Sequence, residues 1–237
     1  MKLGDKIDNY KIPLHPKGIT LFGDLVNLEP LNANQHAIDL FKSNIIDVDG
    51  DNWKYLPYGP FKDIVEYEKW ISEFENLKDP YFFSIIRKQD KKAIGVASYL
   101  RIKPTDGSIE IGHINFSPIL QKKTEATEAM YLMMKWTFDN GYRRYEWKCN
   151  ALNIKSRNAA QRLGFSYEGV FRQMTMNKGR NRDTAWFAVI DKEWMNLEKC
   201  FKKYLSPDNY DNNGNQIISL SKLTKPYLYK VDNLEFT

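Results

Sequence analysis

The sequence has few of the residues that build disulfide frameworks or metal centres. Its 237 residues include two cysteines, Cys149 and Cys200, and three histidines, and the two cysteines stand far apart in the chain. A disulfide scaffold or a structural zinc site needs more ligands at closer spacing. We therefore expect no bound metal and a reducing, cytoplasmic environment.

Long apolar runs are also absent. No stretch reaches the roughly 18 apolar residues of a membrane-spanning helix, and the first residues lack the apolar core of a signal peptide. With 13 glycines and 10 prolines, the chain is too poor in both for a low-complexity or fibrous protein. The sequence predicts a soluble intracellular protein that has no membrane partner.

Positively charged residues are in small excess. The chain has 35 Lys and Arg against 30 Asp and Glu, a formal net charge of +5. This excess is too small for a protein that coats nucleic acid, so we expect an anionic ligand to be bound only locally.

Apolar periodicity divides the chain into alternating strands and helices. Residues 1–20 have no sustained period and read as an N-terminal arm, and residues from 205 on are polar and read as a C-terminal tail. Residues 47–62 are rich in turn formers and aromatics and predict a packed loop. Strands are expected at 25–31, 80–87, 93–102, 108–118, 145–149, 167–176 and 184–190. A first helix is expected to begin at Asn32 or Asn34, and further helices are expected at 63–79, 126–140, 156–163 and 193–204.

The segment from 108 to 172 carries the most specific pattern. The strand IEIGHINF leads to Gln121-Lys-Lys-Thr-Glu-Ala126 and a helix; Asn153-Ile-Lys-Ser156 then starts a second helix, which ends at Leu163-Gly164-Phe165. These motifs closely resemble the GNAT superfamily of acetyl-CoA-dependent N-acetyltransferases, in the branch of the ribosomal-protein N-terminal (RimJ/RimL-like) enzymes. The resemblance covers roughly residues 20–192.

The resemblance implies an α/β fold and a domain at 21–204. Its centre is a mixed, mostly antiparallel twisted sheet of about seven strands flanked by helices, splayed between the fourth and fifth strands. The arm (1–20) precedes this domain, and the tail (205–237) packs on it or extends from it. The protein is expected to be a monomer or a homodimer.

The same resemblance implies a site for acetyl-CoA. The start of the helix after Gln121 presents backbone N–H groups and a favourable dipole to the pyrophosphate. Threonine stands at position 124, where the family pattern usually has glycine. Pantetheine inserts as an extra strand between the splayed strands. The residues implied in binding are Ile114, Asn115, Phe116, Gln121, Lys122, Lys123, Thr124, Glu125, Ala126, Thr127, Asn153, Ser156 and Arg157.

Acetylation of an amine needs a base for the nitrogen and an acid for the departing thiolate. Glu110, His113 and Glu168 lie on strands near the expected split, and the choice of base among them stays open. Many relatives use a tyrosine as the acid where this chain has Ala160. Ser156 takes that role in the branch resembled here, although its hydroxyl is also the expected N-cap of the helix.

The acceptor amine is expected opposite the cofactor. Trp53, Tyr55, Tyr58 and Phe61 make the loop 47–62 too aromatic for a spacer, and they are expected to wall the amine pocket or to pack beneath the loop. The basic hairpin at 178–182 is read as a solvated turn, with the cofactor's 3′-phosphate, an acidic acceptor or RNA as alternative contacts.

The function expected is therefore acetyl transfer to a protein N-terminus or a small-molecule amine. Nucleic acid is expected only through a ribosomal substrate. The alternatives are a non-catalytic domain that senses acyl-CoA, favoured by Thr124 and the missing tyrosine, and a basic RNA-associated module.

Overall fold

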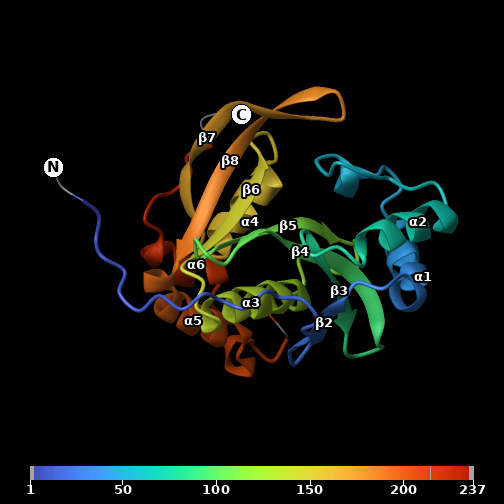
Figure 1. Cartoon of the computed structure of the whole chain (residues 1–237). Coiled ribbons are helices and arrows are strands. Elements are labelled where there is room, and N and C mark those ends of the chain that lie inside the picture. Colours follow the sequence, from blue (N-terminus) through green and yellow to red (C-terminus); the bar gives the residue numbers. More distant parts are fainter. Residues whose placement is uncertain (1–2, 214, 235–237) are drawn as a thin grey trace.

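An open eight-stranded sheet runs through the described part of the chain. The structure is a computed structural model and describes residues 3–213 and 215–234 (Figure 1). The strand order is β1-β2-β3-β4-β5-β6-β8-β7, with β5 and β6 parallel and the other neighbours antiparallel. The strands are β1 (Leu21–Phe22), β2 (Val26–Pro30), β3 (Tyr81–Arg87), β4 (Lys92–Lys103), β5 (Ser108–Phe116), β6 (Arg144–Asn150), β7 (Ser166–Asn177) and β8 (Arg180–Ile190).

Helices cover both faces of this sheet (Figure 1). Side chains of α1 and α2 pack on one face, and those of α3, α4, α5 and α6 pack on the other. Within the described residues, no helix combines the length and apolarity needed to cross a membrane. The helices are α1 (Ala33–Asn44), α2 (Ile64–Phe74), α3 (Thr124–Asp139), α4 (Ile154–Arg162), α5 (Asp191–Leu205) and α6 (Leu220–Thr224), with short 3-10 turns η1 (Asp51–Trp53), η2 (Pro207–Asn209) and η3 (Lys225–Tyr227).

Strand β3 shows why the sheet is buried on both sides. Its sequence YFFSIIR is apolar almost throughout, as expected for a strand with no solvent face. Tyr81, Phe83 and Ile85 belong to the larger core with α3, whereas Phe82 and Ile86 belong to the smaller core with α1 and α2. The alternation of side chains along a strand therefore divides one sequence between two cores.

The structure confirms the mixed sheet and its split between the fourth and fifth predicted strands, which are β5 and β6. The sheet has eight strands, not about seven, because Leu21 and Phe22 pair with Leu28 and Asn27 as an additional edge strand. Helices α3 and α5 begin two residues earlier than predicted, at Thr124 and Asp191.

The C-terminal tail is packed against α4 and β7. Residue Leu220 is fully buried, and the Tyr167 N–H donates to the Lys230 carbonyl at 2.9 Å. The Arg157 guanidinium makes two hydrogen bonds to the Asp232 carboxylate, at 2.7 and 2.6 Å. The exposed fractions of these two side chains are 0% and 1%, so the tail supplies the counter-charge of an arginine buried inside the domain.

We predict that Asp232→Asn strongly destabilises the protein. Removal of one partner from a buried ion pair leaves the other charge desolvated, which costs about 3–5 kcal/mol. The measurement is the free energy of unfolding in urea. The control is Asp211→Asn, an exposed carboxylate of the same tail. If both variants unfold at the urea concentration of the wild type, the ion pair does not hold the tail.

Candidate active site

The central feature of the site is the separation of β5 from β6. The two strands pair only over four positions, from Ser108 with Arg144 to Ile111 with Trp147. Beyond Ile111, the β6-facing edge of β5 has no strand neighbour, and β6 continues beside β8. The structure thus leaves two strand edges with backbone N–H and C=O groups that a ligand can pair.

A bulge in β5 lies directly after the split. Gly112 pairs with Ser98 and Asn115 pairs with Val96, so two residues of β5 oppose one of β4. His113, in the bulge, has φ of +51°, a left-handed conformation that is uncommon for a residue with a side chain. The bulge aims the imidazole at the loop between α1 and α2.

The imidazole of His113 is held by aromatic residues. Its Nδ1 lies 3.1 Å from the Tyr58 hydroxyl, and its ring stacks on Tyr58 and contacts Phe82. Burial lowers the pKa of His113 to about 4, and the nearby Arg101 and Arg182 add to the effect. His113 is therefore neutral near neutral pH.

The four aromatic residues predicted to wall the amine pocket take different places. Trp53 is buried and packs on Phe61, which places these two side chains in the smaller core. Tyr58 is half-buried and faces His113. Tyr55 donates its hydroxyl to the Leu152 carbonyl, just beyond β6, so the loop crosses toward the far side of the split.

The basic hairpin between β7 and β8 is hydrogen-bonded to this loop. Lys178, in the turn between β7 and β8, donates to the carbonyls of Trp53 and Gly59 at 2.9 and 2.8 Å, and Asn177 donates to the Tyr55 carbonyl. In Figure 1 the hairpin reaches toward the segment between α1 and α2. Residues 178–181 are exposed, as expected for a solvated turn, and Lys178 in addition anchors the loop between α1 and α2.

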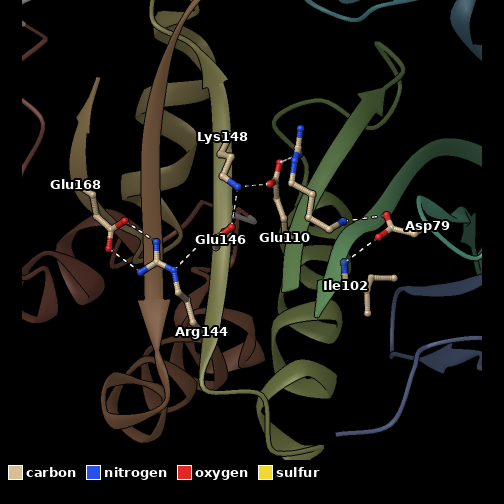
Figure 2. Close-up of polar contacts among 8 residues, drawn as sticks. Asp79, Ile102, Glu110, Arg144, Glu146, Lys148 and Glu168 are labelled. Atoms are coloured by element: carbon tan, nitrogen blue, oxygen red, sulfur yellow. Dashed lines mark hydrogen bonds and ion pairs between the residues drawn. The ribbon is translucent and has the colours of Figure 1, made fainter. Parts of the chain in front are cut away.

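Charged side chains of alternating sign cross the sheet below the split (Figure 2). On the β6 side, the Glu168 carboxylate accepts two hydrogen bonds from Arg144, whose Nε donates to Glu146 at 2.7 Å. Lys148 continues the series with its Nζ at 2.8 Å from the Glu146 carboxylate. We call the series the charge chain; its members are Glu168, Arg144, Glu146, Lys148, Glu110 and Arg101.

Glu110 is the member of the charge chain on β5. One carboxylate oxygen lies 2.7 Å from Lys148 Nζ, and the other accepts from Arg101 at 2.8 Å. Burial raises the pKa of Glu110, although Lys148 and Arg101 oppose the shift. Glu168 lies beyond β6 and β8 in Figure 2, on the opposite side from Glu110, and is bound by Arg144. Of the three predicted bases, Glu110 and His113 therefore lie at the split.

Residues predicted to bind the pyrophosphate surround the start of α3. No side chain caps this helix, so the first-turn amides of Thr124, Glu125 and Ala126 have no intrahelical acceptors. Lys122 and Lys123 are exposed beside them. These amides and lysines form a site suited to an anion.

The side chains around the start of α3 already have hydrogen-bond partners in the protein. Thr124 Oγ1 lies 3.1 Å from the Tyr210 hydroxyl of the tail, and Thr127 Oγ1 accepts from Arg162. Gln121 donates to the Phe116 carbonyl at 2.9 Å, which joins the end of β5 to the loop.

The β5 residues predicted to bind pantetheine follow the bulge. Ile114 and Phe116 are half-buried and pack against the larger core. Asn115 is fully buried, and both polar atoms of its side chain lack a hydrogen-bond partner among the described residues. A buried amide without partners at this position is an incomplete polar environment, as expected beside a ligand site.

The start of α4 differs from the prediction. Asn153, not Ser156, is the N-cap, and its side chain accepts from the Ser156 N–H at 3.1 Å. Ser156 lies in the first turn, where its hydroxyl oxygen accepts from Trp147 Nε1 at 3.0 Å. The hydroxyl proton of Ser156 is not used in this contact, and the hydroxyl also forms a hydrogen bond with the Cys149 side chain. The Arg157 guanidinium is buried against Asp232 and the Ala151 carbonyl, which turns it away from a cofactor.

Burial raises the pKa of Cys149 to about 11, which leaves the thiol protonated near neutral pH and unsuited as an acyl nucleophile.

Sequence reasoning missed most of the charge chain. Arg144, Glu146 and Lys148 alternate along β6, a spacing that places them on one face of a strand, and this signal was available. Arg101 and Lys178 gave no comparable signal, because their partners come from distant segments.

Comparison with known proteins agrees with this geometry. The family model of the GNAT acetyltransferase domain matches residues 26–166, more than half of the chain. The chain therefore belongs to the GNAT acetyltransferase family.

Individual relatives extend the match. A crystal structure of a GCN5-related N-acetyltransferase from Brucella melitensis is 40% identical, with a TM-score of 0.89 over 92% of this chain and 100% of that one. An uncharacterized N-acetyltransferase, p20 of Bacillus licheniformis, is 28% identical over 145 residues, which are 60% of this chain and 81% of p20. RimL, a ribosomal L7/L12 alpha-N-protein acetyltransferase, shares the fold at 20% identity, with a TM-score of 0.62 over 73% of this chain and 94% of RimL.

We predict that Ser156→Ala lowers turnover with little loss of helix stability, because Asn153 still caps α4. The variant lacks the hydroxyl proton, and general acids contribute about 100-fold or more to turnover. The control is Trp147→Phe, which removes the indole donor and keeps the hydroxyl. Steady-state kinetics and thermal unfolding of both variants are the measurements. Full turnover in Ser156→Ala would assign protonation of the thiolate to water.

We predict that Tyr58→Phe raises the KM for the acceptor by about fivefold, equivalent to a hydrogen bond of about 1 kcal/mol. The ring and its packing stay, but His113 Nδ1 loses its partner. The KM for acetyl-CoA is expected to be unchanged. Tyr55→Phe is the matched control, since it removes a hydroxyl from the same loop away from His113. Equal effects of the two substitutions would show that the loop acts only by packing.

Proposed function

We propose that this protein transfers an acetyl group from acetyl-CoA to a primary amine, on a protein N-terminus or a small molecule. The observation that carries the proposal is the split between β5 and β6, with the bulge at His113 and the buried Glu110 on its acceptor side. Both cysteines are buried free thiols, which supports a reducing, cytoplasmic location.

The residues present fit acetyl-CoA. The free edges of β5 and β6 can pair with the amides of pantetheine, and the uncapped start of α3 with its two lysines suits the pyrophosphate. Bound there, acetyl-CoA supplies an activated acyl group as a thioester. Asn153 uses its side-chain oxygen to cap α4, so its NH₂ group remains for the cofactor.

Glu110 is the proposed general base. The amine nitrogen must lose a proton as its bond to the acetyl carbon forms and the carbon–sulfur bond breaks. Burial brings the pKa of Glu110 closer to neutral pH, whereas the pKa of His113 lies at about 4. A base works best when its pKa lies near the operating pH, which favours Glu110. The thiolate takes its proton through the hydroxyl of Ser156.

His113 and Tyr58 have a positioning role in this proposal. The tyrosine hydroxyl and the imidazole fix each other's orientation at 3.1 Å, and His113 follows directly after the end of the β5–β6 pairing. A neutral ring at this point contributes no repulsion to a nearby amine.

We predict that Glu110→Gln lowers kcat by about 10²- to 10⁴-fold, the range of general base catalysis. The glutamate accepts a proton only when ionised, so kcat/KM of the wild type falls as the pH drops through its raised pKa. The measurement is release of free thiol from acetyl-CoA with a panel of amines and peptides, across pH. Thermal shift with acetyl-CoA checks that each variant still binds the cofactor.

Glu168→Gln is the matched control, because it neutralises an exposed member of the charge chain and should keep wild-type turnover. If Glu110→Gln keeps turnover and His113→Gln loses it, the base is His113. If the wild type binds acetyl-CoA and acetylates no amine, the protein is a sensor and the proposed activity is wrong.

A further inference from the structure

Arg182 is a cation at the site without an anion. It lies on β8, near the hairpin turn, and its side chain is half-buried. Its Nε is buried and has no hydrogen-bond partner among the described residues. Burial lowers the pKa of Arg182 and the nearby Arg101 adds to the effect, whereas Glu110 opposes it.

The neighbours of Arg182 place it at the acceptor side. It lies close enough to His113 and Glu110 to act on them electrostatically. Along β8, Arg182 and Trp186 lie four positions apart and therefore on the same face, where the Trp186 ring lies 3.8 Å from Lys148 Nζ. Trp186 Nε1 is a second buried donor without a partner in the described chain.

The charge chain does not supply the missing anion. Its three carboxylates and three cations pair with one another from Glu168 to Arg101, so it is balanced in itself. Asp183, next to Arg182, is engaged by the Gln173 N–H and by Asn181. Four other arginines, Arg87, Arg101, Arg144 and Arg157, have carboxylate partners, and the half-buried Arg162 donates to the hydroxyls of Thr127 and Tyr204. Within residues 3–213 and 215–234, Arg182 forms no ion pair with a carboxylate.

We infer that Arg182 binds a carboxylate of the acceptor, and that the substrates are amines that carry one. This inference rests on the proposed acetyl transfer. A guanidinium binds a carboxylate through two parallel hydrogen bonds, which fixes the orientation of the acceptor as well as its charge. The carboxylate belongs either to a free amino acid or to an acidic residue at a peptide N-terminus.

The same cation favours the reactive form of the amine. Only a neutral amine attacks the thioester, and a positive charge nearby disfavours the ammonium form. Arg182 therefore attracts the carboxylate of a zwitterionic acceptor while it promotes loss of the proton from its nitrogen. A polyamine has several positive charges and no carboxylate, and is expected to be a poor substrate.

The test compares acceptors that differ only in the carboxylate. The pairs are a free amino acid with its carboxamide, and a peptide beginning with Asp with the same peptide beginning with Asn. The wild type is expected to have at least a tenfold lower KM for each carboxylate. In Arg182→Gln, the KM for the carboxylates rises at least tenfold, the KM for the amides changes far less because only the effect on amine protonation is lost, and the KM for acetyl-CoA is unchanged. Since the variant is compared with the wild type for each acceptor, the basicity of each amine cancels.

Two further variants make the result specific. Arg180→Gln removes an exposed arginine two positions earlier on β8 and should leave both acceptor classes unchanged. Arg182→Lys keeps the charge, loses the two-pronged geometry and should give an intermediate KM. If Arg182→Gln does not fold, Arg182→Lys tests the inference in its place. The amino acid pair and the peptide pair separately identify the source of the carboxylate.

Several outcomes would overturn the inference. Equal KM values of the wild type for carboxylates and amides would do so, as would a rise in the KM for acetyl-CoA alone, which would place Arg182 on the cofactor. Calorimetry of the same acceptor pairs with coenzyme A present separates this inference from the proposed activity. Preferential binding of the carboxylate that is lost in Arg182→Gln supports the role of Arg182 even if no acetyl transfer occurs.

Discussion

The site depends on one constraint, the limited pairing of two parallel strands. After Ile111 and Trp147, β5 and β6 separate, and each keeps one edge without a strand neighbour. Unpaired backbone groups inside a sheet are unfavourable unless a ligand or solvent satisfies them. The bulge at His113 takes the end of β5 out of register with β4, and β6 stays fully paired with β8. The opening is therefore built into the pairing of the sheet.

Electrostatics organises the acceptor side of this opening. Lys148 lies between two carboxylates and under the ring of Trp186, so a buried ammonium joins the two strands just where their backbones part. Buried charges are tolerated when each has partners, and the charge chain meets this condition from one side of the sheet to the other. Arg182 departs from the pattern. An arginine without an anion beside a paired series is most simply explained by an anionic substrate.

Segments outside the matched family region contact the proposed site. The tail brings Asp232 to the buried Arg157 and Tyr210 to Thr124, at the opening proposed for the pyrophosphate. Lys178 holds the loop between α1 and α2 through two backbone carbonyls. The tail and the hairpin therefore also contact residues of the two proposed binding regions.

The sequence by itself determined the order of most elements and the helix after Gln121, because these follow from local periodicity and motif spacing. The position of the split followed from the resemblance to the family. It also indicated Glu110 and His113 as neighbours of the split. Only the tertiary structure decided the partners. Ser156 could be read as a cap until Asn153 was seen to take that position, and Arg157 could be read as a cofactor ligand until Asp232, 75 residues away, was seen to bind it. Periodicity reports which face a side chain occupies, whereas its partner on that face is set by the packing of distant segments.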